Sequence, residues 1–206
     1  MPRVASPAER GYFRVGRVRG APVRIHWTTP IGAFLFSGMI VGAAFAPGAW
    51  AAFVLLVLVH ELGHAALVRR FGLRVLAIDV HGAGGACRWQ GHATELQRAK
   101  IAWGGVLAQA LLLVATALVA PIAPREPLVA QIVQTWTATN VLMIAFNLLP
   151  IRGLDGAEAW TLLRWRNLRG AGKRAALEAR MRRIEGQLRA IEDERAERGA
   201  NRHDVS

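Results

Sequence analysis

Residues 49–72, AWAAFVLLVLVHELGHAALVRRFG, constrain the fold of this chain more than any other segment. The segment is wholly apolar up to Val59, and His60, Glu61 and His64 then follow within the same run. Ionisable side chains are costly inside a membrane, and where they occur they usually serve a function. A membrane helix that carries three of them is therefore a candidate functional site.

Four apolar segments indicate an α-helical polytopic membrane protein with about four transmembrane helices. Each segment is close to the ~20 residues that cross a bilayer, and they cover about residues 27–46, 50–68, 101–120 and 128–149. The chain is 53% hydrophobic, yet it carries a net charge of +12. These two properties are compatible when the apolar residues lie in a lipid bilayer and the basic residues flank it.

The distribution of basic residues predicts the orientation. Of the 26 Lys and Arg residues, 25 lie in residues 1–26, 69–100 and 152–206, and only Arg125 lies in the loop 121–127. By the positive-inside rule, both termini and the central loop are cytoplasmic. We therefore expect a multi-pass membrane protein, and the Arg- and Ala-rich composition indicates a prokaryotic cell membrane. The basic residues are not interleaved with aromatic residues along a helix face, so the pattern does not favour nucleic-acid binding.

Two stretches outside these spans have the alternation of β-strands. Residues 12–26 alternate apolar and basic side chains around Gly20-Ala21-Pro22, which predicts a β-hairpin before the first span. Residues 73–90 contain a β-branched run, a glycine-rich turn and a second short run. Because open sheet edges are not tolerated facing lipid, we expect both elements at the cytoplasmic interface or against protein.

The chain divides by composition into a membrane core, residues 1–166, and a charged helical cytoplasmic tail, residues 167–206. The tail has apolar residues spaced 4, 3, 4 and 3 positions apart, at Leu177, Met181, Ile184, Leu188 and Ile191. This spacing is typical of a heptad stripe, here of about two heptads. We expect an amphipathic helix that packs on its own domain, and a homodimer through this C-terminal helix is the alternative.

Residues 60–64, HELGH, form an HExxH motif. On an α-helix, residues four positions apart share one face, so both imidazoles can bind one metal ion, and Glu61 is placed to act on a metal-bound water. Zinc suits imidazole ligands and lowers the pKa of bound water to near neutrality. The motif predicts one Zn²⁺ per chain. The alternative is a polar network that ties helices together.

A catalytic zinc site usually has three protein ligands and a water. The favoured third ligand is Asp155, because Pro150 ends the fourth span and allows the chain to fold back toward the bilayer. Asp155 can also serve as the N-cap of a helix over residues 156–165. The remaining histidines are further candidates: His26, His81, His92 and His203.

The HExxH motif and the stretch Asn147-x-x-Pro150-x-x-x-Leu154-Asp155-Gly156 together resemble the site-2 protease family of intramembrane zinc metalloproteases. The resemblance is to the compact bacterial and archaeal type without a PDZ domain, and it covers about residues 13–165. The segment 16–27 and the glycines at 82–85 are also similar to family elements. One departure is residues 105–109, GVLAQ, where many members have Gly-Pro-x-x-Asn.

The resemblance implies a role for individual residues. His60, His64 and Asp155 would bind zinc, and Glu61 would be the catalytic general base. Asn147 would position the substrate backbone or stabilise the oxyanion, although it can also be a polar tie between helices.

The region 73–90 would bind substrate along a strand edge that includes Gly84 and Gly85. The predicted activity is that of a zinc-dependent endopeptidase, which cleaves a transmembrane protein substrate within or next to its membrane helix. The alternative is a non-proteolytic membrane protein, such as a zinc transporter or a catalytically silent scaffold of the same fold.

Overall fold

Three helical stretches in the computed structural model are long and apolar enough to cross a membrane. The structure describes residues 11–38, 46–163, 180–184 and 186. The three stretches are Pro47–Arg70, Glu95–Ile122 and Pro127–Asn147, with 24, 28 and 21 residues. They coincide with three of the four predicted spans. Residues 39–45 of the predicted first span lie outside the described ranges, so a fourth span stays a prediction.

Local sequence explains where these helices begin and end. Helix α3, Pro47–Arg70, starts with proline in its first turn, where a missing N–H costs nothing, and is followed by Gly72 in the left-handed region (φ 73). Helix α4, Glu95–Val119, begins with a capping box. In this box the Thr94 hydroxyl accepts from the Gln97 N–H at 3.2 Å, and the Gln97 side chain accepts from the Thr94 N–H at 2.9 Å.

The other helical elements are shorter and interrupted. A 3₁₀ turn, η3 (Ala120–Ile122), extends α4. The third stretch consists of α5 (Pro127–Gln134), the π-helical turn η4 (Thr135–Thr139) and α6 (Asn140–Asn147). Before α3, the chain forms α1 (Thr29–Ala33) and a second π-helical turn, η2 (Phe34–Gly38).

The β-strands that the sequence predicts form one four-stranded sheet. The strands are β1 (Tyr12–Val18), β2 (Ala21–His26), β3 (Arg74–His81) and β4 (Gly84–Gln90), in the order β1-β2-β3-β4. The pairs β1–β2 and β3–β4 are antiparallel hairpins. The two hairpins are joined by parallel pairing of β2 with β3, in which Val23 lies opposite Ile78. Among the described strands, β4 is therefore an edge of this sheet with no partner on its outer side.

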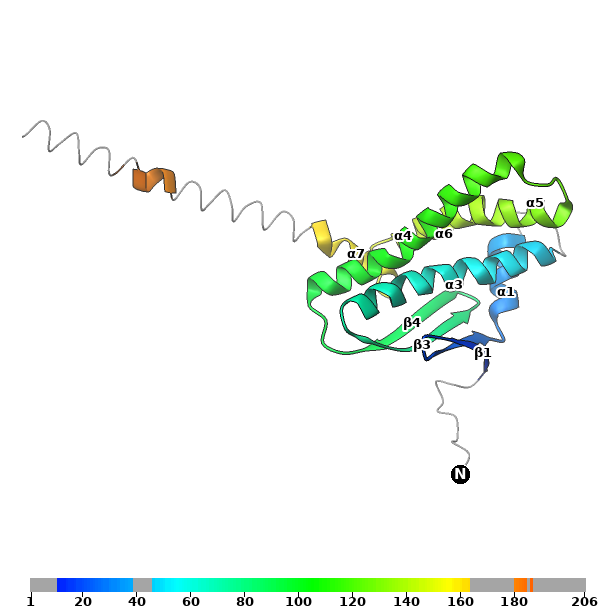
Figure 1. Ribbon diagram of the computed structural model, residues 1–206, viewed down its shortest axis with the longest axis horizontal. Helices are drawn as coiled ribbons and strands as arrows, with labels where there is room; N and C mark the ends of the chain where they lie inside the picture. The colour runs from blue at the N-terminus through cyan, green and yellow to red at the C-terminus, as the bar shows by residue number, and fades with distance from the viewer. Residues whose placement is uncertain (1–10, 39–45, 164–179, 185, 187–206) are drawn as a thin grey trace, which may run out of the picture. The chain divides into compact units, whose positions relative to one another are not determined.

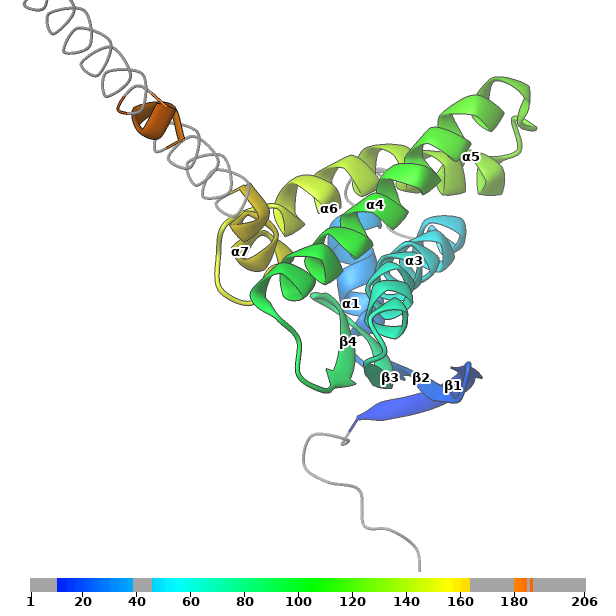
Figure 2. The same ribbon diagram turned by 60° about the vertical axis from the view of Figure 1, so that its left-hand side comes forward.

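Helix α3 lies at the centre of the arrangement. The sheet lies along one side of α3, and α4, α5 and α6 lie on the other (Figures 1 and 2). On the sheet side, Val23 and Ile78 pack against Ala65. On the α4 side, Gly63 and Gly104 face each other so closely that a Cβ on Gly63 would lie 2.2 Å from the Gly104 carbonyl oxygen. These two glycines let α3 and α4 pack backbone to backbone beside the HExxH motif.

The chain divides into two compact units, residues 1–162 and 163–206. In the second unit the structure describes Leu163, residues 180–184 and residue 186, and Met181 and Ile184 are exposed. The rest of the predicted heptad stripe lies outside the described residues. Both expectations for the tail, packing on its own domain and dimer formation, stay predictions.

Candidate metal centre

Helix α3 places His60 and His64 one turn apart, and both side chains are buried. Their Nε2 atoms lie 2.9 Å apart, and the two rings meet edge to face at 84°. Glu61 lies beside them and is only 2% exposed. The i, i+4 spacing thus brings both imidazoles to one point, as the sequence predicts.

Asp155 reaches the same point from the other end of the chain. It is the first residue of α7, Asp155–Ala159, and its Oδ2 lies 2.9 Å from His60 Nε2 and 3.2 Å from His64 Nε2. Leu154, not Asp155, occupies the N-cap position of this helix. Burial alone would raise the pKa of Asp155, but its interactions with the two histidines outweigh burial and lower that pKa.

Both histidines are oriented by acceptors on α4. The Nδ1 of His64 lies 2.7 Å from the Ile101 carbonyl oxygen, and the Nδ1 of His60 lies 2.9 Å from Gln109 Oε1. Because these oxygens can only accept, each Nδ1–H donates, and each Nε2 lone pair points at the centre. Gly105 lies between the two acceptors in sequence, and a Cβ there would be 2.5 Å from His64 Nε2.

The three donor atoms fit a zinc ion. Tetrahedral zinc with nitrogen and oxygen ligands at ~2.1 Å holds those ligand atoms ~3.4 Å apart. The separations in the structure, 2.9 to 3.2 Å, are within about half an ångström of that value. The buried Glu61 Oε2 also has no hydrogen-bond partner among the described residues. A buried carboxylate oxygen without a partner is expected where a proton or an ordered water is handled.

Strand β4 packs against Glu61. The backbone of Cys87 hydrogen-bonds the Glu61 carboxylate, and a Cβ on Gly85 would lie 2.5 Å from Glu61 Oε1. The absence of a side chain at Gly85 therefore lets the strand approach the carboxylate. Burial, aided by the nearby Glu61 carboxylate, raises the pKa of the Cys87 thiol to about 12.

The metal centre opens into a cleft of about 910 Å³. Gly84 and Gly85 line it from the start of β4, and Asn147 lines it from the end of α6. The structure therefore brings all three to the walls of one cleft, and it assigns Asn147 no hydrogen bond to His60 or His64.

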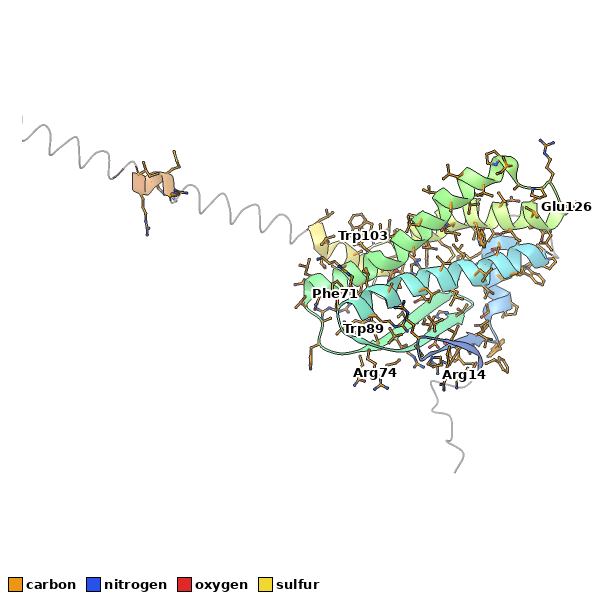
Figure 3. The ribbon with its side chains drawn as sticks, viewed as in Figure 1. Arg14, Phe71, Arg74, Trp89, Trp103 and Glu126 are labelled. Atoms are coloured by element: carbon orange, nitrogen blue, oxygen red, sulfur yellow. The ribbon has the colours of Figure 1, made fainter. Side chains whose placement is uncertain are left out.

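Two tryptophans fix the segment that carries Asp155. Trp103 on α4 donates its Nε1–H to the Ala159 carbonyl oxygen at 3.0 Å, and Trp160 donates to the Leu148 carbonyl oxygen at 2.7 Å. The two rings meet edge to face with centroids 5.9 Å apart. Figure 3 labels Trp103 on α4, near α7. Helix α4 thus orients the histidines and also anchors the helix that carries Asp155.

The other described histidines do not join the centre. The His26 ring hydrogen-bonds the Thr28 hydroxyl. His81 lines the cleft, but it does not belong to the group of side chains that could bind a metal ion. His92 borders a separate small cavity, and His203 lies outside the described residues. Sequence reasoning missed the orienting partners of the ligands. The stretch 105–109, which ends at Gln109, entered it only as a departure from the family pattern, and a backbone carbonyl such as that of Ile101 leaves no signal in a sequence.

Comparison with known proteins agrees with the resemblance seen in the motifs. The chain is 34% identical over 176 residues to a Mycobacterium tuberculosis protein named "Putative zinc metalloprotease Rip3", matched in two strains. The match covers 76% of this chain but 44% of the relative, so the chain spans less than half the length of that protein. No family model matches the chain.

The fold is that of a solved site-2 protease. The structure of the site-2 protease from Methanocaldococcus jannaschii matches with a TM-score of 0.58 and 21% identity, over 72% of this chain and 69% of that chain. The resemblance to the site-2 protease family is thereby confirmed, by the fold and by a zinc metalloprotease homologue.

Proposed function

For a chain with the site-2 protease fold, we propose the function of a zinc-dependent endopeptidase that cleaves a membrane-protein substrate within or next to its transmembrane helix. One observation carries the proposal. Two imidazole nitrogens and a carboxylate oxygen converge within 3.2 Å, beside the buried carboxylate of Glu61, at the floor of a large cleft. A structural polar tie between helices needs neither the carboxylate nor the cleft.

His60, His64 and Asp155 are the proposed zinc ligands, with one ion per chain. A Zn²⁺ ion held there would polarise the scissile carbonyl and lower the pKa of water to about 7. Helix α4 orients the two imidazoles. Hydrogen bonds to the Ile101 carbonyl and to Gln109 fix the tautomer in which both Nε2 atoms are free to bind metal.

Glu61 is the proposed general base and acid. Its free Oε2 can accept a proton from the attacking water and can later deliver it to the nitrogen of the leaving amine. The hydrogen bond from the Cys87 backbone and the close approach of Gly85 hold the carboxylate in place during both transfers. Asn147, on another wall of the cleft, is proposed to position the substrate backbone or to donate to the developing oxyanion.

The free edge of β4 is the proposed substrate-binding surface. A transmembrane helix hides its carbonyls in its own hydrogen bonds, so its cleaved segment must be unwound and held in an extended form. Strand β4 pairs with β3 on one side only and lines the cleft with Gly84, Gly85 and Trp89. An extended segment can add to this edge as a further strand, with its carbonyls facing the metal centre.

The proposed membrane arrangement has four spans with both termini in the cytoplasm. His60 lies thirteen residues after Pro47 on α3, or ~20 Å along the helix axis, and ten residues before Arg70, or ~15 Å. The metal centre is therefore well inside the bilayer, somewhat nearer the basic end of α3. The cleft supplies the water that hydrolysis needs at this depth.

The non-proteolytic alternative, a zinc transporter, requires a polar route past the site. In the described parts of the helices beyond the centre, residues 29–38, 47–59, 105–119 and 127–147, there is no ionisable side chain. The buried polar groups there are amides and hydroxyls, such as those of Gln109 and Asn140. These groups are weak ligands for a zinc ion in transit, so they do not favour transport.

The experiment is a cleavage assay with a single-span membrane protein in liposomes. Wild type and Glu61→Gln are reconstituted with the substrate, and mass spectrometry locates any cut. The proposal expects a zinc-dependent cut within or beside the membrane helix by wild type, and a loss of at least about 10²-fold in rate for the variant, as for removal of a general base. Equal cleavage by both proteins would refute the mechanism, and a cut confined to a soluble loop would refute the intramembrane site.

A further inference from the structure

A second cavity of about 800 Å³ lies apart from the metal centre. It is bounded by the turn between β1 and β2, the C-terminal end of α3 and the start of β3. Four arginine side chains line it: Arg17, Arg19, Arg69 and Arg74. No carboxylate lines the cavity, and within the described part of the chain none of the four forms an ion pair.

We propose that this arginine cavity binds a phosphate group, carried either by an anionic phospholipid headgroup or by a free phosphate. The guanidinium fork matches phosphate oxygens in a bidentate manner, which makes arginine the preferred residue for this ligand. Four like charges around one cavity repel one another, and a bound anion removes that repulsion.

The convergence of these arginines is built into the fold. Arg69, in the last turn of α3, donates from Nη2 to the Val18 carbonyl oxygen at 2.7 Å, which holds its guanidinium against the β1–β2 turn. Arg17 is near the end of β1, Arg19 is in the turn that follows, and Arg74 is the first residue of β3. A general excess of basic residues on one side of a membrane predicts arginines in these loops, but it does not require three separate segments to direct them to one cavity.

The turn itself carries an unusual residue. Arg19 has φ 47, and it is the one non-glycine residue with positive φ in the described part of the chain. Arg19 and Gly20 form the two-residue turn of the hairpin, in which Asn, Asp or Gly is favoured at such positions. An arginine there strains the backbone, because its Cβ crowds the following carbonyl oxygen at positive φ. That strain is offset if the side chain serves a ligand.

The position of the arginine cavity and its apolar walls suit a phospholipid. The cavity lies at the end of a candidate membrane span that ends at Arg70, which is the depth at which phospholipid headgroups are found. Apolar side chains complete its lining, from Leu73, Val75 and Leu76. In such a complex the headgroup phosphate contacts the arginines, and the glycerol and acyl carbons contact these apolar side chains.

The test compares two double variants of the full-length protein that each remove two positive charges. Arg17→Gln/Arg74→Gln changes two exposed arginines of the cavity, and the matched control Arg14→Gln/Arg70→Gln changes two exposed arginines that do not line it. Arg14 is on the same strand as Arg17, and Arg70 is next to Arg69. Figure 3 shows Arg14 and Arg74 well apart along the sheet. Thermal unfolding of both variants verifies that they fold.

Binding is measured by native mass spectrometry with phosphatidylglycerol and phosphatidylcholine, and by thermal shift with inorganic phosphate. Each arginine near a phosphate contributes about fivefold in affinity, so the cavity variant is expected to bind phosphatidylglycerol about 25-fold more weakly, and the control within about threefold of wild type. If inorganic phosphate binds more weakly to the cavity variant than to the control, and phosphatidylglycerol does not bind, then free phosphate is the source of the ligand. Equal weakening in both variants, or no binding of either probe to wild type, overturns the proposal.

Discussion

Replacement of Gln109 by methionine tests the orientation of a proposed zinc ligand, His60, without changing His60 itself. Methionine has nearly the same length and volume as glutamine, but it lacks the carbonyl oxygen that lies 2.9 Å from His60 Nδ1. Gln109 is 0% exposed, so bulk water cannot take the place of that oxygen. The variant therefore leaves a buried N–H without an acceptor and frees the His60 ring to change tautomer or rotate.

Two independent magnitudes give the same expected effect. A buried donor without a partner costs about 1–3 kcal/mol. Loss of an outer partner of a metal-binding histidine lowers metal affinity about 10–100-fold, which corresponds to ~1.4–2.7 kcal/mol. We expect the zinc dissociation constant of Gln109→Met, measured by competition with a chromophoric chelator, to rise by this factor.

Gln109→Glu is the matched control. Gln109 Nε2 has no hydrogen-bond partner among the described residues, so its replacement by oxygen removes no hydrogen bond, and an acceptor for His60 remains. Zinc affinity at or above the wild-type value is expected for this variant. The reasoning is refuted if Gln109→Met binds zinc as wild type does, or if Gln109→Glu loses as much affinity as Gln109→Met while both remain folded.

Further predictions concern the neighbours of the centre. Gly105→Ala introduces a Cβ 2.5 Å from His64 Nε2. Overpacking of this kind costs about 1–3 kcal/mol, so zinc affinity should fall about 5- to 150-fold, and unchanged affinity would be inconsistent with the packing. Trp103→Phe removes the hydrogen bond to the Ala159 carbonyl, and faster amide hydrogen exchange is expected in α7 than in wild type. With a pKa of about 12, the Cys87 thiol should react with iodoacetamide at pH 8 more slowly in the native protein than after denaturation, and equally fast native labelling would contradict the raised pKa.

Local sequence patterns were sufficient for part of the structure. Helical periodicity places His60 and His64 on one face because their spacing is one turn. Alternation of side chains and the glycine turns predict both β-hairpins. The parallel pairing of Val23 with Ile78, by contrast, joins residues from two hairpins separated by a membrane helix. No local pattern reports such a pairing, since it depends on how both hairpins pack on α3.

The candidate site, like the fold, could be predicted from the sequence only in part. The motif identifies the side chains that can bind metal, and the break at Pro150 favours Asp155 as the third ligand. The sequence does not reveal what orients those side chains, because the Ile101 acceptor belongs to the backbone and Gln109 acts from a different helix. The four-span topology and the roles of the site residues, including Asn147, Gly84 and Gly85, stay predictions.

The most direct test of the central claim is zinc K-edge absorption spectroscopy on the purified full-length protein, together with its zinc content. The account predicts one zinc per chain, bound by two imidazole nitrogens and by oxygen, with the affinity strongly reduced in Asp155→Ala. A protein that binds no zinc, a site with a sulfur ligand, or an Asp155→Ala variant that binds zinc as tightly as wild type would contradict it.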